Sequence, residues 1–215
     1  MTDHHMGAQT VLAIDTSAPR LQLALFHDEG IDVLVEDISK GHAEIIFDRI
    51  ATLFTRNKLS YQALTRLAVT TGPGSFTGLR IGLSTARGLG LALGIPVIGV
   101  PTLRAHALGG SRDVQTAVLL DARRGEAYFE VFAQPDLSSD GPVLLPMDQA
   151  RQSVPQDAMR IEGAFLDISA LARFAQKADI HAFPANPVYV RAADAKPQQK
   201  ARITRLPASQ SGPAL

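Results

Sequence analysis

The sequence predicts an α/β protein built from two similar subdomains. Two segments, VLAIDTSAPRLQLALF (11–26) and AVLLDARRGEAYFEVF (117–132), align without a gap at an offset of 106 residues. Each has an apolar strand that ends in an aspartate, Asp15 or Asp121, then a polar turn and a second strand that closes with Phe. Between the two segments, strand-like apolar runs alternate with helix-like stretches, which is the pattern of an α/β fold.

The repeated segments are read as hairpins. Apolar and polar residues alternate over 21–25 and 127–131, as in half-buried antiparallel strands. Two unrelated hairpins would give a similar pattern, because apolar hairpins are common. If the segments are copies of one unit, the paired turns face each other across a cleft. The two aspartates would then lie where a metal-bound phosphate could be held.

Further strands and helices are predicted along the rest of the chain. Residues 32–38 read as a third strand, and residues 42–56 as an amphipathic helix with its apolar side chains at i, i+3 and i+4 spacing. The rest of the first half is predicted as strand 67–71, a glycine turn, a helix to about residue 93, strand 96–100 and a helix from about residue 102. The second half is predicted as strands 142–145 and 160–162, helix 168–177, and a short strand from 187 that runs into a basic tail.

The amino-acid composition excludes several classes of function. The chain has 215 residues, 46% of them hydrophobic, with 21 cationic and 21 acidic side chains. Zero net charge argues against a protein that mainly coats nucleic acid. The absence of cysteine excludes disulfides, thiolate metal sites and a cysteine nucleophile. No apolar stretch is long enough for a membrane span, and the N-terminus lacks the features of a secretion signal, so a cytoplasmic location is expected.

The glycine turn TGPGSFTGLRIGL (71–83) matches neither common nucleotide motif. It has no lysine for a Walker loop, and its third glycine comes one residue too late for G-x-G-x-x-G. Ser75 or Thr77 is expected to cap the following helix. Inside that helix, small residues recur every four positions and share one face, although each interior glycine costs about 1 kcal/mol relative to alanine. This stripe could pack against the protein's own sheet or against a partner helix.

Several motifs together resemble the TsaB (YeaZ) family of the actin-like ATPase-domain superfamily. They are VLAIDTS (11–17), GPGSFTGLRIG (72–82), IPVIGVPTL (95–103), LLDARRGEAY (119–128) and PVYVR (187–191). The resemblance implies a duplicated actin-like (ASKHA, ribonuclease H-like) fold with two subdomains, each a mixed sheet flanked by helices. The implied divisions are a flexible N-terminus (1–9), a first subdomain (10–108), a reduced second subdomain (109–195) and a basic, disordered tail (196–215).

The resemblance also implies a function. TsaB-like proteins are obligatory partners of a TsaD-type transferase, which places a threonylcarbamoyl group on adenosine beside the anticodon of tRNAs reading codons that begin with A. A TsaE-type ATPase joins that complex, tRNA is bound through the complex, and a homodimer forms when the partner is absent. The family docks through its first two helices. The implied partner-interface residues are Ile46, Phe47, Ile50, Phe54, Gly78, Gly82, Ala86 and Gly90.

The chain is not expected to be a catalyst. The transferase holds its metal with His-x-x-x-His, whereas here Ile46 stands four residues after His42. The adenosine-binding Gly-Gly turn is matched only by the single glycine of IEGAF (161–165). No catalytic residue, metal site or tightly bound cofactor is therefore expected, although ATP or ADP could bind in the complex. A vestigial nucleotide cleft would comprise Asp15, Thr16, Ser17, Asp121 and Arg123.

Two other functions compete with the partner role. A stand-alone ATP-binding kinase or ATPase of the actin-like class would use Asp15, Asp121 and the cleft between them. A peptidase is disfavoured because the sequence has no cysteine, no zinc-binding pair and no Gly-x-Ser-x-Gly elbow. The basic tail, with Arg191, Lys196, Lys200, Arg202 and Arg205, could touch tRNA or could simply be solvated.

Overall fold

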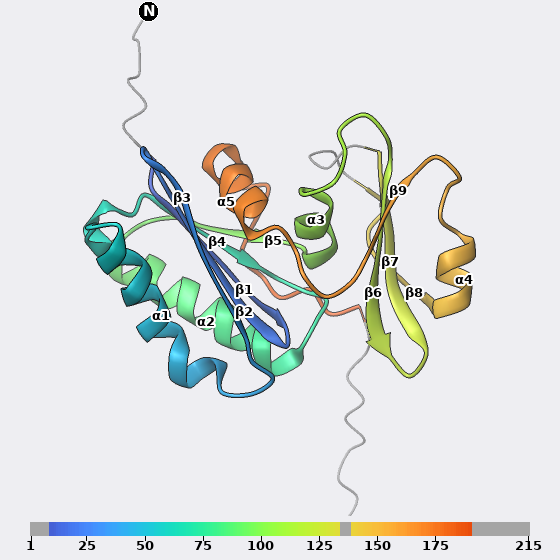
Figure 1. The fold of residues 1–215 in the computed structure, drawn as a ribbon, viewed down its shortest axis with the longest axis horizontal. Coiled ribbons are helices and arrows are strands. Elements are labelled where there is room, and N and C mark those ends of the chain that lie inside the picture. Colours follow the sequence, from blue (N-terminus) through green and yellow to red (C-terminus); the bar gives the residue numbers. More distant parts are fainter. Residues whose placement is uncertain (1–8, 134–138, 191–215) are drawn as a thin grey trace, which may run out of the picture.

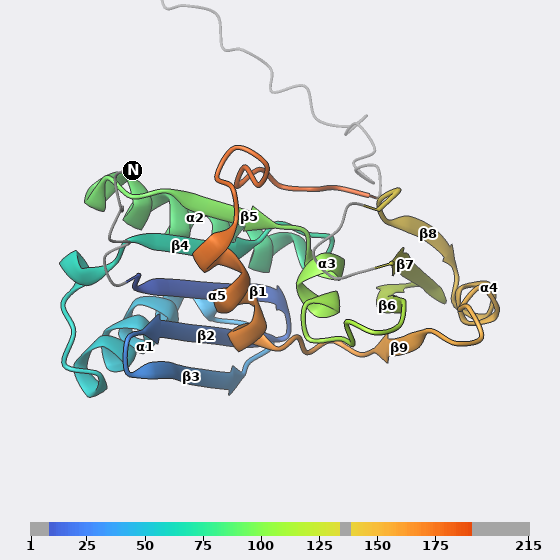
Figure 2. The same cartoon turned by 90° about the horizontal axis from the view of Figure 1, so that it is seen from above.

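The computed structural model describes residues 9–133 and 139–190. Two β-sheets lie side by side, each with helices packed on it (Figures 1 and 2). Residues 1–8 and 191–215 lie outside the described residues, and with them almost all of the predicted flexible N-terminus and the whole basic tail. None of the helices in the described ranges has the length and apolar character needed to cross a membrane.

The first sheet has five strands in the order β3-β2-β1-β4-β5. β1 is antiparallel to β2 and β2 to β3, whereas β4 and β5 continue the sheet in parallel on the other side of β1. The strands are β1 (Val11–Ala18), β2 (Arg20–His27), β3 (Gly30–Asp37), β4 (Arg66–Thr70) and β5 (Val97–Val100).

The second sheet repeats this plan with one strand fewer, in the order β8-β7-β6-β9. Its antiparallel pairs β6·β7 and β7·β8 and its parallel pair β6·β9 correspond to β1·β2, β2·β3 and β1·β4. The predicted duplicated α/β fold is therefore confirmed. The strands are β6 (Thr116–Arg123), β7 (Glu126–Phe132), β8 (Val143–Pro146) and β9 (Met159–Glu162).

The two hairpins differ in register by one residue. Asp15 pairs with Gln22 in the first hairpin, and Asp121 pairs with Ala127 in the second. The stretch that connects the aspartate to its paired residue is thus one residue shorter in the second hairpin, and the gapless alignment is wrong for the second strand of each pair. In both hairpins the pairing is irregular just after the aspartate.

Helices cover both faces of the first sheet (Figures 1 and 2). α1 (His42–Arg56) and α2 (Phe76–Leu93) lie on one face, and α5 (Ile168–Lys177) lies on the other. Two helices pack on the second sheet: α3 (Thr102–Ala107) contacts β6 and β7, and the short α4 (Met147–Gln152) contacts β7 and β8. The sequence did not predict α4. A 3₁₀ turn spans Tyr61–Ala63. Residues 187–190 form no strand, although the Val188 N–H donates to the Thr71 carbonyl at 2.8 Å.

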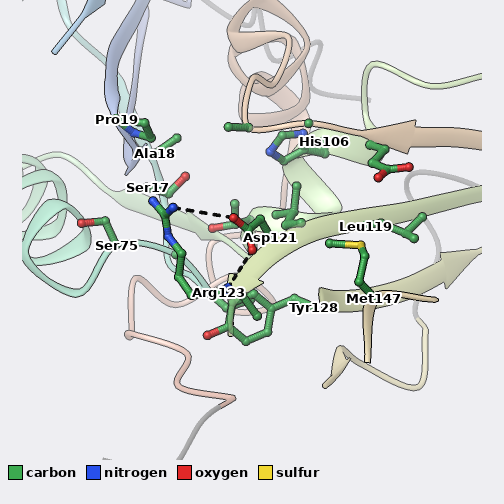
Figure 3. Close-up of a pocket in the computed structure, with 18 residues that line it drawn as sticks. Ser17, Ala18, Pro19, Ser75, His106, Leu119, Asp121, Arg123, Tyr128 and Met147 are labelled. Atoms are coloured by element: carbon green, nitrogen blue, oxygen red, sulfur yellow. Dashed lines mark hydrogen bonds and ion pairs between the residues drawn. The ribbon is translucent and has the colours of Figure 1, made fainter. Parts of the chain in front are cut away.

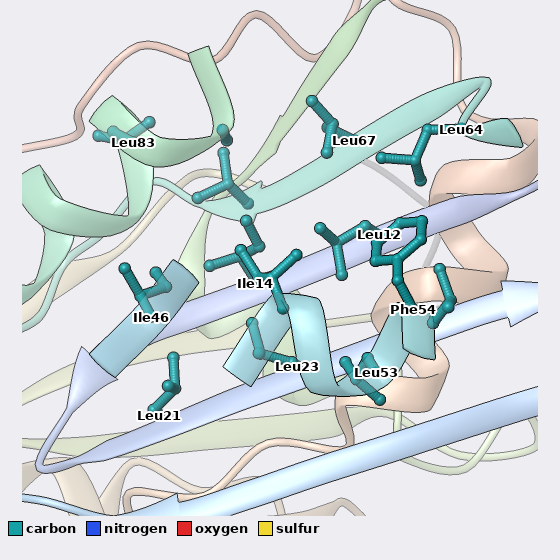
Figure 4. Packing of buried hydrophobic residues seen from close by; sticks show 14 residues of the cluster. Leu12, Ile14, Leu21, Leu23, Ile46, Leu53, Phe54, Leu64, Leu67 and Leu83 are labelled. Atoms are coloured by element: carbon teal, nitrogen blue, oxygen red, sulfur yellow. The ribbon is translucent and has the colours of Figure 1, made fainter. Parts of the chain in front are cut away.

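Every residue of β1 is buried because helices cover it on both sides. Leu12 and Ile14 point toward α1 and α2 (Figure 4), whereas Val11 and Ala13 belong to the cluster beneath α5. Because successive side chains of a strand point to opposite faces, alternate residues of β1 pack into two different apolar cores.

Three of the predicted interface residues on α1 belong to the chain's own core. Ile46, Ile50 and Phe54 are at most 3% exposed and pack against the first sheet. The same spacing that makes the helix amphipathic directs these side chains inward. Phe47, by contrast, is 54% exposed, so it is the predicted α1 residue that remains available to a partner.

The stripe of small residues on α2 also faces inward. A Cβ added to Gly78 would lie 2.0 Å from the Thr16 carbonyl oxygen, and one added to Gly82 would lie 2.5 Å from Thr16 Oγ1. A Cβ at Gly90 would lie 2.5 Å from a methyl group of Val97, and Ala86 is fully buried. The partner-facing prediction for Gly78, Gly82, Ala86 and Gly90 is therefore wrong. They let α2 approach β1 and β4 closely.

Candidate functional site: the cleft between the sheets and the outer face of α1 and α2

The turn before α2 begins the helix as the sequence predicted. The Ser75 hydroxyl accepts the N–H of Gly78 at 3.2 Å, which caps the helix. The Ser75 N–H donates to the Ser17 carbonyl at 2.7 Å and so ties this turn to the end of β1. The glycine turn and the first aspartate hairpin thereby form one wall of a cleft.

The cleft between the sheets has a volume of about 540 Å³. Its first wall includes Ser17 and Ser75, and its second wall includes Asp121 and Arg123 at the end of β6 (Figure 3). The IEGAF turn contributes Gly163, where an added Cβ would meet no atom within 4 Å. Of the five residues predicted at the cleft, Ser17, Asp121 and Arg123 line it, whereas Asp15 and Thr16 do not.

Asp15 is fully buried and held by its own chain. Its Oδ1 accepts the Thr70 hydroxyl at 2.6 Å and the Ser17 N–H at 3.1 Å, while its Oδ2 has no hydrogen-bond partner among the described residues. Thr16 is also occupied, since its hydroxyl donates to the Gly78 carbonyl at 2.8 Å. Thr16 therefore ties α2 to the sheet, whereas Asp15 ties the end of β1 to β4.

Asp121 repeats the local turn of Asp15 at the surface. Its Oδ1 accepts the N–H of Arg123, two residues on, at 2.7 Å, as Asp15 does with Ser17. This supports the interpretation of both aspartates as turn-capping residues. Arg123 also approaches the Asp121 carboxylate at 3.7 Å. Its φ of 65° places it in the left-handed region, which is uncommon for a residue with a side chain.

His106 also lines the cleft, although no sequence pattern singled it out. It lies on α3, is 2% exposed, and its Nδ1 has no hydrogen-bond partner in the described part of the chain. Burial lowers the pKa of His106 to about 4, and the negative charge of Asp15 opposes that shift only in part. The imidazole is consequently neutral at pH 7.

The carboxylates around the cleft already have partners within the chain. Asp15 is enclosed, Asp121 is engaged by Arg123, and Glu162 is bound by Arg151 at 2.5 Å. A magnesium ion needs carboxylate oxygens that are free to replace part of its water shell. No three His, Cys, Asp or Glu side chains within residues 9–133 and 139–190 converge in a way that could hold a metal ion.

The outer face of α1 and α2 carries a second hollow, a groove of about 400 Å³. Phe47 of α1 and Phe76 of α2 are each 54% exposed there, and the Arg80 guanidinium lies 3.8 Å from the centre of the Phe76 ring. The ring of Tyr189 lies 5.9 Å from that of Phe76 and extends the apolar surface. We call this surface the docking face; its groove is lined by Ala43, Ile46, Phe47, Phe76, Thr77, Arg80, Ile81, Ser84 and Thr85.

Farther along α2, Gly88 is exposed on the helix. A Cβ added to Gly88 would meet no atom within 4 Å, unlike one added to Gly82 or Gly90. Packing within the described chain therefore does not require glycine at this position. An interior helical glycine costs about 1 kcal/mol relative to alanine, and at Gly88 no internal contact offsets that cost.

Comparison with known proteins identifies relatives of the whole fold. A family profile described as "TsaD: tRNA N6-adenosine threonylcarbamoyltransferase" matches residues 26–134. An uncharacterized protein of Mycobacterium tuberculosis (strain H37Rv) is 35% identical over 158 residues, which is 72% of each chain. The structure of YeaZ from Pseudomonas aeruginosa superposes with a TM-score of 0.69 at 26% identity, covering 84% of this chain and 99% of that one.

Two further relatives carry a functional name. The tRNA threonylcarbamoyladenosine biosynthesis protein TsaB of Escherichia coli is 38% identical over 122 residues, or 55% of this chain and 53% of the relative. The protein of the same name from Bacillus subtilis is 34% identical over 121 residues, again 53% of its length. The similarity thus spans about half the length of these two named relatives.

Proposed function

The chain belongs to the TsaB (YeaZ) family of actin-like proteins, and we propose that it acts in the biosynthesis of threonylcarbamoyladenosine in tRNA. Its proposed role is that of a non-catalytic partner that binds and activates a TsaD-type transferase. It would work in the cytoplasm, with a TsaE-type ATPase and tRNA joining through the complex. A homodimer would use the same surface when the transferase is absent.

The observation that carries this proposal is the docking face. Phe47 and Phe76 are each 54% exposed and share one groove with Arg80. Exposed aromatic and arginine side chains of this kind are the residues that most often anchor protein interfaces. Gly88 on the same helix would allow a partner helix to approach closely. The docking face also lies on the two helices through which relatives are expected to dock.

The cleft supports a partner role over an enzymatic one. The two carboxylates that line it, Asp121 and Glu162, are already engaged by Arg123 and Arg151, so binding a metal-nucleotide would first require breaking these contacts. The competing hypothesis is a stand-alone kinase or ATPase. Calorimetry of the isolated chain with Mg-ATP separates the two hypotheses: micromolar binding, reduced by Asp121→Asn, would favour the enzyme.

Co-purification with the TsaD-type subunit tests the docking face. Phe47→Asp places a charge in the middle of the apolar groove and should reduce association at least tenfold, because a buried unpaired carboxylate is strongly unfavourable. Val143→Asp is the matched control, since Val143 is 47% exposed on β8 of the other sheet. The proposal predicts that Val143→Asp assembles normally and supports tRNA modification.

Equal assembly of the Phe47→Asp and Val143→Asp proteins would reject the docking face. Replacing Gly82 would not be a fair test of it, because a larger side chain there collides with Thr16 and disturbs the fold itself. Circular dichroism of each variant shows whether the fold is intact. A modification assay with and without this chain then tests activation separately from binding.

A further inference from the structure

A third hollow lies beneath α5, on the side of the first sheet opposite the docking face. It is a groove of about 720 Å³ between α5 and the segment that follows α3. Phe26, Phe174 and Phe183 supply apolar surface within it, and the last two rings meet edge to face at 5.0 Å. α5 and the pair α1 and α2 lie on opposite faces of the sheet (Figure 2), so a partner on the docking face would leave this groove open.

Three cations line this groove without partners. Arg112, Arg173 and Lys177 are exposed, and none makes an ion pair or hydrogen bond within the described ranges. The acid in the lining, Asp167, is occupied: its Oδ1 accepts the N–H groups of Ser169 and Ala170 and caps α5. The groove therefore carries a local positive charge in a chain whose net charge is zero.

Several arginines elsewhere in the described residues are paired with acids. Arg49 binds Glu36 and Arg56 binds Asp32 along α1, and Arg151 binds Glu162 in the second half. The position of Lys177 in the last turn of α5 has a local explanation, because a cation there is favoured by the helix dipole. That explanation does not extend to Arg112, which lies outside α5, or to Arg173, which precedes the last turn.

We propose that the α5 groove binds the phosphate backbone of RNA. Unpaired cations around a concave groove provide the charge complementarity that phosphates require, and partly exposed aromatic rings in such grooves suit nucleotides. An anionic membrane surface would instead favour a flat or protruding basic patch. The proposal rests on the proposed function, which supplies tRNA as the polyanion, and it adds a second surface to the one that meets the transferase.

The groove is tested with two double variants that each remove the same number of cations. Arg173→Gln with Lys177→Gln removes two unpaired cations from the groove, and Lys40→Gln with Lys58→Gln removes two unpaired cations from the ends of α1. Binding of tRNA to the complex of this chain with its TsaD-type partner is measured by fluorescence anisotropy over a range of salt concentrations. The slope of log affinity against log salt should become shallower by about 1.5 for the groove variant and stay unchanged for the control.

Equal slopes for the two double variants would overturn the inference, as would stronger binding of phosphatidylserine vesicles than of RNA at the groove. Association with the transferase is recorded in the same samples, so failure of the docking face is seen separately as loss of the complex. If no complex forms, the same pair of variants is compared on the isolated chain at low salt. Lack of any RNA binding there, or binding that the groove variant does not weaken, would also count against the groove.

Discussion

Replacing Gly88 with alanine should stabilise the protein, although glycines elsewhere on α2 cannot be replaced. A Cβ at Gly88 meets nothing within 4 Å, so the substitution adds no collision. Alanine is favoured over glycine inside a helix by about 1 kcal/mol. For a domain of this size, that gain corresponds to a rise in Tm of about 2–4 °C. Gly82→Ala should do the opposite and destabilise by about 1–3 kcal/mol, because its Cβ would lie 2.5 Å from Thr16 Oγ1.

Urea denaturation of the two purified variants gives the change in unfolding free energy, and thermal scans give the change in Tm. The reasoning is refuted if Gly88→Ala fails to stabilise, since the helix would then contact something at that position within the chain. It is equally refuted if Gly82→Ala stabilises as much as Gly88→Ala. Gly88→Leu extends the test to function: it should retain the fold and weaken co-purification with the TsaD-type subunit, because the larger side chain holds the partner away from α2.

Three further changes have defined outcomes. Burial lowers the pKa of His106 to about 4 from 6.5. At a pH between these two values, His106 is therefore protonated in the unfolded chain and neutral in the folded one. Unfolding free energy should therefore fall by up to about 3 kcal/mol as pH drops from about 6.5 to about 4, and His106→Gln should flatten this slope in urea titrations. Arg123→Asn should stabilise by up to about 1 kcal/mol, because asparagine tolerates the left-handed conformation better; an unchanged melting curve would contradict this. Arg66→Met should destabilise by about 1.5–3 kcal/mol through loss of the charged hydrogen bonds to the carbonyls of Ala175 and Ala178, seen as faster amide exchange in α5.

The sequence predicted the repeated hairpins, most element positions and a helix cap at Ser75 or Thr77, of which the structure shows Ser75, because these depend on local periodicity and side-chain chemistry. It did not predict which way the small residues of α2 face. A four-residue spacing places them on one side of the helix, but only the packed structure shows that Thr16 and Val97 occupy that side. The one-residue difference in register between the two hairpins was also missed, since such a small difference between aspartate and partner leaves both second strands looking alike in sequence.

At the cleft, too, the sequence pattern did not predict which side chains are buried. Asp15 and Asp121 occupy equivalent positions in the sequence repeat and make equivalent turns, yet one is fully buried and the other is exposed. Burial depends on the helices that cover each sheet, and the first sheet has more of them. His106 could not be selected because its environment is created by residues distant in sequence, including Asp15.

The double covering of β1 has a practical consequence for genetics. Its side chains alternate between the layer that carries Phe47 and the layer that carries Arg173, and both layers share its backbone, so a change that displaces the strand disturbs both. A loss-of-function allele in residues 11–18 would therefore reveal nothing about which surface a cell depends on. Alleles that separate the two must come from the solvent-facing sides of the helices.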